Sequence, residues 1–88
     1  MHYFFPPAAA YRLNQCLFQL KSDDAFRARY RTDPGAALAE LGLDADIQVA
    51  VRALDRDRLV ALGAHPYLVF MAALRLRMES EAEAFEYF

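Results

Sequence analysis

Residues 63–74 read Gly63-Ala64-His65-Pro66-Tyr67-Leu68-Val69-Phe70-Met71-Ala72-Ala73-Leu74. The first four residues are typical of a helix boundary, and the next eight are all apolar. A helix that packs on a small core buries one stripe of roughly 100° and leaves its other faces polar. Eight consecutive apolar residues point in every direction around a helix axis. We therefore expect part of this block to face something other than its own domain, namely the surface of a partner subunit.

Helix signals continue on the N-terminal side of this block. Apolar residues recur there at helical spacing, in segments bounded by Asp, Pro and Gly residues, and no useful length alternates as a strand does. The predicted helices span about 8–21, 23–32, 34–41, 44–54 and 55–62, and the last and longest begins at His65-Pro66. The sequence therefore predicts an all-α fold, a compact single-domain bundle of five or six short helices.

Length and composition set the domain organisation. The 88 residues are enough for one domain. We expect an extended N-terminal arm at 1–7, a helical domain at 8–79 and an acidic aromatic arm at 80–88. The C-terminal arm is either extended or, since Met78, Ala82 and Phe85 have helical spacing, a continuation of the last helix along a partner. Seven Phe and five Tyr are many for so small a core. We expect some of these rings to be exposed for binding.

Charge and cysteine content exclude several function classes. The net charge is −2, and the closest approach to a basic cluster is Arg27, Arg29 and Arg31, whose spacing scatters them around a solvated helix. Nucleic acid is therefore not an expected partner. No apolar run is long enough to cross a membrane, and no signal peptide is visible. The single cysteine, Cys16, fits a reducing compartment, so we expect a cytoplasmic protein.

The sequence contains few residues of the types that catalyse reactions or bind metals. The only histidines, His2 and His65, are far apart, so neither an iron nor a zinc ligand set is expected within the chain. Cys16 lies on the apolar face of a helix, where we expect a buried, inert thiol. We predict no catalytic residue, no metal ligand and no cofactor for this chain.

Three polar residues stand out at predicted helix positions. His65 precedes Pro66 at a helix start, where it either packs or caps the helix or faces the pocket of a neighbouring subunit. Asn14 and Gln15 are adjacent amides in an apolar helix, where amides either bind backbone groups of a neighbouring segment or contact a partner. The sequence leaves both alternatives open.

Several short motifs, in order, carry a resemblance to a known family. They are Tyr11-Arg12-Leu13-Asn14-Gln15, the segment from Phe26 to Pro34, the landmarks Gly42, Asp57 and Gly63, and Gly63-Ala64-His65-Pro66-Tyr67-Leu68. Over about residues 11–75 the chain resembles the small (alpha, LigA-type) subunit of protocatechuate 4,5-dioxygenase-like (LigAB) extradiol ring-cleavage dioxygenases.

The resemblance implies one half of a two-subunit enzyme. In that family a large (beta, LigB-type) subunit holds Fe(II), a catecholic substrate binds the iron, and the ring opens next to the two hydroxyls. The small helical subunit lies over the mouth of the pocket. The implied role is a non-catalytic lid and assembly subunit, and the residues expected to face the partner or the substrate are Tyr11, Asn14, His65, Tyr67 and Phe70.

Two other functions stay open. The helical domain is also similar to the leader part of split borosin-type precursors, which present a tail to a peptide-modifying enzyme. Such a tail is usually rich in small and β-branched residues, and residues 79–88 contain no β-branched residue. A self-associating structural protein is the third possibility, and it predicts a symmetric homodimer through the Tyr67–Leu74 block.

Overall fold

The computed structural model describes residues 8–86, and the side chains of residues 10–79. The described residues form six α-helices and no strand, which confirms the all-α prediction. The helices are α1 (Ala8–Ser22), α2 (Asp24–Thr32), α3 (Pro34–Glu40), α4 (Ala45–Ala53), α5 (Arg56–Ala61) and α6 (Pro66–Glu86). The expected N-terminal arm at 1–7 lies outside the described residues, whereas residues 80–86 continue α6.

Aspartates begin three of the short helices. Each accepts a backbone N–H from the first turn, which otherwise has no partner: Asp23 from Phe26, Asp33 from Ala36 and Asp55 from Arg58. Pro34 occupies the first turn of α3, where its missing N–H costs nothing. These short helices therefore begin where the sequence predicts.

A continuous apolar core fills the space between the helices. Its largest fully buried side chains are Phe26, Leu13, Leu17, Leu20, Leu38, Leu59, Val51 and Cys16. Each of the helices α1 to α5 supplies at least one of these side chains, and α6 contributes Val69 and Ala72 to the same core. Burying a side chain of this size stabilises the fold by about 1.5–3 kcal/mol, so these positions determine how the helices pack.

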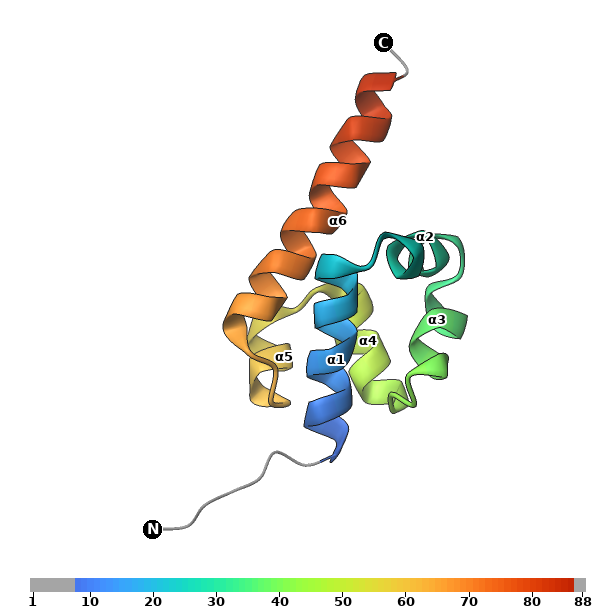
Figure 1. Ribbon diagram of the computed structural model, residues 1–88. Helices are drawn as coiled ribbons and strands as arrows, with labels where there is room; N and C mark the ends of the chain where they lie inside the picture. The colour runs from blue at the N-terminus through green and yellow to red at the C-terminus, as the bar shows by residue number, and fades with distance from the viewer. Residues whose placement is uncertain (1–7, 87–88) are drawn as a thin grey trace.

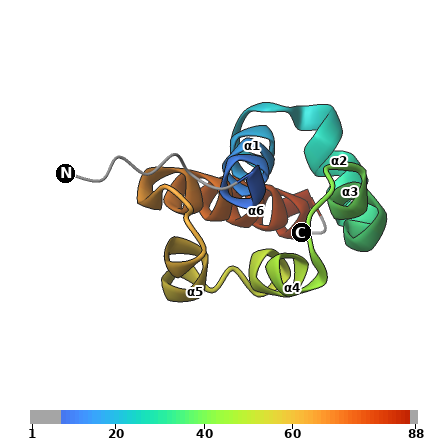
Figure 2. The same cartoon turned by 90° about the horizontal axis from the view of Figure 1, so that it is seen from below.

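The two long helices lie side by side. Figures 1 and 2 show α1 against α6, and this is the most extensive contact between any two described helices. The short helices α2 to α5 form an arc next to this pair, each packed on the next. The C-terminal part of α6 extends past the other helices (Figure 1). No described helix is long and apolar enough to span a bilayer.

Arg27 holds three helices together. It is buried, its Nη1 donates to the Leu20 and Lys21 carbonyls at the end of α1, and its Nε donates to Glu79 Oε1 on α6 at 2.5 Å. A second arginine of α2, Arg31, donates to the other oxygen of Glu79 at 3.2 Å. The prediction of a solvated arginine face is therefore wrong for Arg27, because bonds to the free carbonyls of α1 and to a carboxylate compensate its burial.

Candidate functional site

The turn between α5 and α6 requires a glycine. Gly63 has φ +105°, a conformation that L residues rarely adopt, and a Cβ at this position would lie 2.7 Å from the Cβ of Ala10 on α1. Ala64 is buried directly after it. The turn therefore lies tightly against the first described residues of α1, and this contact determines where α6 begins.

His65 caps the start of α6. Its Nδ1 accepts the backbone N–H of Tyr67 at 3.2 Å, and Pro66 is the first residue of the helix. An Nδ1 that accepts a hydrogen bond carries no proton, which places the proton of the neutral ring on Nε2. The imidazole is exposed and meets the Tyr67 ring edge-on, with the ring centroids 6.5 Å apart. Nδ1 thus contributes to the start of the helix, and Nε2 makes no hydrogen bond within the described residues.

Asn14 joins α1 to this turn. Its Nδ2 donates to the carbonyls of Ala10 and Gly63 at 2.9 and 3.0 Å, and its Oδ1 accepts the backbone N–H of His65 at 2.7 Å. The amide therefore binds the backbone of a neighbouring segment, which is the first of its two predicted roles. The same bond positions the backbone of His65 at the start of α6.

The apolar block at the start of α6 has two faces. Val69 and Ala72 are buried in the core, whereas Tyr67 and Phe70 are 53% and 61% exposed. This confirms the expectation that the domain itself does not cover the whole block. Large rings in this state are uncommon on the surface of a monomer unless they bind something.

Exposed rings of α1 continue this surface. Tyr11 and Phe18 are 67% and 53% exposed and lie on one side of α1, because seven residues make two helical turns. Lys21 connects the two helices, since its Nζ lies 5.6 Å from the centre of the Phe18 ring and 5.2 Å from that of Tyr67. We call the four rings Tyr11, Phe18, Tyr67 and Phe70 the α1–α6 face.

A groove opens beside this face. It has a volume of about 440 Å³ and lies between the first two turns of α6 and the segment that joins α4 to α5. Tyr67 and Phe70 form part of its wall, and among the described residues Arg56 is the only charged one that lines it. Leu54, which takes a left-handed conformation (φ +51°) where α4 ends, also lines this groove.

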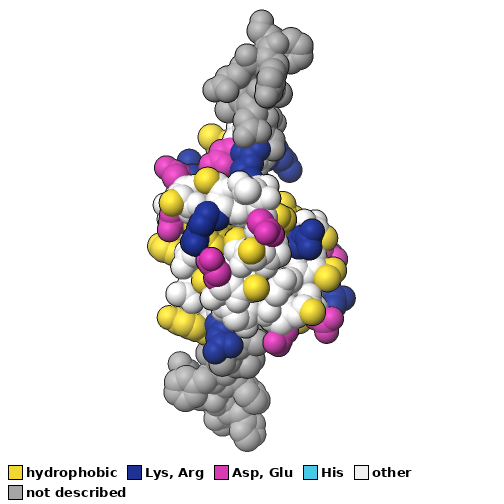
Figure 3. All heavy atoms as spheres, turned by 90° about the vertical axis from the view of Figure 1, so that its right-hand side faces the viewer, with side chains coloured by type: hydrophobic (Ala, Val, Ile, Leu, Met, Phe, Trp, Pro, Cys, Tyr) yellow, Lys and Arg dark blue, Asp and Glu magenta, His cyan; other side chains and the backbone are white. Residues whose placement is uncertain are grey.

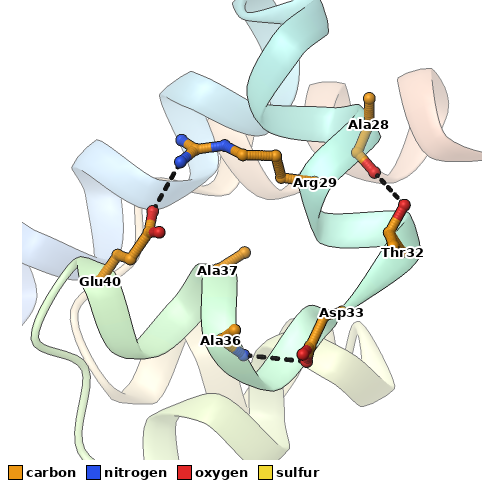
Figure 4. Close-up of a pocket in the computed structure, with 7 residues that line it drawn as sticks. All are labelled: Ala28, Arg29, Thr32, Asp33, Ala36, Ala37 and Glu40. Atoms are coloured by element: carbon orange, nitrogen blue, oxygen red, sulfur yellow. Dashed lines mark hydrogen bonds and ion pairs between the residues drawn. The ribbon is translucent and has the colours of Figure 1, made fainter.

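The opposite side of the molecule differs. On the side of α2 and α3, apolar side chains are separated by basic and acidic ones (Figure 3). A pocket of about 360 Å³ lies between these two helices, and Arg29 spans it to Glu40 with Nη1 and Oε2 2.8 Å apart (Figure 4). Its other polar side chains, Thr32 and Asp33, bond to backbone groups of the same two helices. The polar side chains that line this pocket are thus engaged with other groups of α2 and α3.

Comparison with known proteins identifies the family of this chain. The family model of the aromatic-ring-opening dioxygenase LigAB, LigA subunit, matches residues 13–83. The chain belongs to the LigA family. The searches of curated proteins and of solved structures gave no match.

The LigA match covers most of the site. It includes Asn14, His65, Tyr67 and Phe70, and it begins two residues after Tyr11. Sequence reasoning missed three residues of this surface: Phe18, Lys21 and Arg56. The spacing of seven residues from Tyr11 was a usable signal for Phe18. No local pattern points to Arg56, because the groove forms only when the segment after α4 meets α6.

One nucleophilic side chain, the thiol of Cys16, lies elsewhere in this LigA-family chain. Cys16 is fully buried, and burial raises the pKa of its thiol to about 12, so the thiol stays protonated and unreactive at neutral pH. Among the described residues, no three His, Cys, Asp or Glu side chains come together in a way that could hold a metal ion.

Proposed function

We propose that this protein is the non-catalytic small subunit of a cytoplasmic, Fe(II)-dependent extradiol dioxygenase that opens the ring of a catecholic compound. The family match by itself indicates a subunit of an aromatic-ring-opening dioxygenase. In this proposal the iron and the catalytic residues belong to a large, LigB-type subunit. The lack of a metal-ligand cluster in the described residues supports that division of roles.

The observation that carries the proposal is the double-sided start of α6. One side, with Val69 and Ala72, completes the core, and the other presents Tyr67 and Phe70 next to the exposed rings of α1. Apolar area that a domain leaves in water stabilises a complex by roughly 25 cal/mol for each Å² that a partner covers. The α1–α6 face is therefore the surface on which the large subunit docks.

The five residues predicted for the lid or interface contribute in different ways. Tyr11, Tyr67 and Phe70 supply apolar area, and His65 adds an exposed imidazole next to the Tyr67 ring. Asn14 contributes indirectly, because its amide is engaged by the chain's own backbone. A cover of this kind excludes water from a neighbouring pocket and restrains the substrate, which favours the reaction without any reacting group on the cover.

Co-expression with a large, LigB-type subunit tests this function. The two chains should elute together on a sizing column, and the pair should open the ring of a catechol. Tyr67→Ser combined with Phe70→Ser should abolish co-elution while the helix content of the free chain stays unchanged, because both rings are exposed. Val49→Ser is the matched control, since Val49 is 64% exposed but lies on α4.

Three results would contradict the proposal. The first is that the purified subunits do not associate. The second is that the free chain forms a stable homodimer through Tyr67 and Phe70, which would favour a self-associating structural protein. The third is that the chain gains methyl groups, seen by intact mass, when co-expressed with a peptide N-methyltransferase, which would favour the borosin-type role.

A further inference from the structure

Two cations flank the rings at the start of α6. Lys21, near the end of α1, lies over Phe18 and Tyr67, and Arg56, at the start of α5, lines the groove with Tyr67 and Phe70. The start of α6 lies beside both α1 and α5 (Figure 2). Tyr67 is therefore placed between a cation contributed by α1 and another contributed by α5.

Neither cation has a carboxylate partner within the part of the chain that the structure describes. In that part of the chain, Arg27 forms ion pairs with Asp24 and Glu79, and Arg31 also pairs with Glu79. Arg29 pairs with Glu40. Lys21 interacts with aromatic rings, which carry no net charge. Asp55, the residue before Arg56, instead accepts the backbone N–H of Arg58.

A partner that covers the rings also removes water from these two cations. Burying an unpaired charge costs several kcal/mol, whereas a buried charge with a well-placed counter-ion is tolerated. With a purely apolar partner surface, the cost of desolvating Lys21 and Arg56 would therefore cancel much of the binding free energy gained by covering Tyr67 and Phe70. A partner that places carboxylates opposite both cations avoids this loss and also fixes the orientation of docking.

We propose that the large subunit meets the α1–α6 face with an apolar patch that carries carboxylates on two sides, one pairing with Lys21 and one with Arg56. This inference rests on the proposed function and adds the chemistry of the partner surface. The chain as a whole has a net charge of −2, so this cationic face is a local feature and not a consequence of overall charge. Attraction between such surfaces weakens with added salt.

The test measures the dissociation constant of the complex as a function of salt concentration for three methionine variants. Lys21→Met and Arg56→Met remove the charge and keep an unbranched apolar side chain. Each should weaken binding by about tenfold or more at low salt and should reduce the salt dependence. Arg58→Met is the matched control, because Arg58 is an exposed arginine of the same helix as Arg56, does not line the groove, and has no ion pair in the described structure. It should bind within about twofold of the wild type.

Other outcomes separate the failure of this inference from that of the proposed function. If the wild-type complex forms and Lys21→Met or Arg56→Met binds as Arg58→Met does, the acidic partner surface is wrong and the proposed function stands. If the wild-type chains do not associate, the proposed function itself fails. If the same two variants abolish a homodimer of the free chain instead, the occupant of the face is a second copy and not the large subunit. Should Lys21→Met fold poorly because it loses its ring contacts, Arg56→Met still decides the question.

Discussion

The side-chain oxygen of Asn14 accepts the backbone N–H of His65 at 2.7 Å, so the middle of α1 holds the residue that caps α6. The same amide also donates to the Gly63 carbonyl at 3.0 Å. One side chain thereby bonds two residues, Gly63 and His65, of the four-residue connection between α5 and α6. The position of the exposed rings on α6 relative to those on α1 depends on this connection.

Asn14→Ala should destabilise the isolated chain by about 1–3 kcal/mol, because it leaves the Gly63 carbonyl and the His65 N–H without their partner. For a domain of this size each kcal/mol lowers the melting temperature by about 4–8 °C. Thermal unfolding followed by circular dichroism measures the change. Gln15→Ala is the control, since Gln15 is exposed and its substitution should change stability by less than about 0.5 kcal/mol. Equal melting temperatures for the two variants would show that the bonds of Asn14 contribute nothing to stability.

His65 has a capping role that can be separated from any role towards a partner. His65→Asn keeps a side-chain acceptor for the Tyr67 N–H and should retain the stability of the wild type, whereas His65→Ala should lose about 1 kcal/mol. Neither variant keeps a donor at the position of Nε2. If Nε2 contacts the large subunit, both variants should weaken the complex, although only His65→Ala unfolds at a lower temperature. A His65→Asn complex as tight as that of the wild type would restrict His65 to its capping role.

The glycine of the turn provides a test of the contact between Gly63 and Ala10. Gly63→Ala should cost about 2 kcal/mol or more, because the new methyl group meets Ala10 and the backbone keeps a positive φ. Gly35→Ala, in the first turn of α3, should instead raise stability by up to about 1 kcal/mol, since its nearest neighbour would lie 3.7 Å away and alanine favours the helix. Denaturant unfolding of the two variants should thus show changes of opposite sign. A neutral Gly63→Ala would mean that α1 moves away from the turn at little cost.

The helix boundaries were predictable because each depends on a few neighbouring residues. Asp33-Pro34 begins α3, and glycines follow α3 and α5 at Gly42 and Gly63, both with positive φ. The exposed ring surface was predictable in part for the same reason, since eight apolar residues in a row cannot all be covered by one small core. These features follow from local composition and helical geometry alone.

Features that depend on distant residues were not predictable. Arg27 is buried because Glu79, 52 positions further along the chain, and the end of α1 both reach it. Arg56 joins the site because the segment after α4 meets the start of α6. Helical periodicity assigns a face to each residue but does not say which helix will lie against that face.

Glu79 joins α6 to α2, because Arg27 and Arg31 of α2 both donate to its carboxylate. Partial burial alone would raise the pKa of its carboxyl group, but the hydrogen bonds and charges of Arg27 and Arg31 outweigh burial and lower it below the usual 4.5. A lowered pKa in the folded state means that the ionised carboxylate stabilises the fold. This contribution is complete above the usual value and is lost as the pH falls through the lowered one.

Glu79→Gln should therefore lower the free energy of unfolding at pH 7 by about 1–3 kcal/mol, because Arg27 stays buried after losing one of its anionic partners. The difference from the wild type should shrink as the pH falls below about 4.5, where the wild type also loses the charge. Denaturant unfolding across this pH range measures both effects. Glu40→Gln is the control, since its ion pair with Arg29 is exposed on both sides and should contribute less than about 1 kcal/mol. A Glu79→Gln variant whose stability differs from the wild type by the same amount at pH 7 and at low pH would show that the charge of Glu79 does not hold α6 to α2.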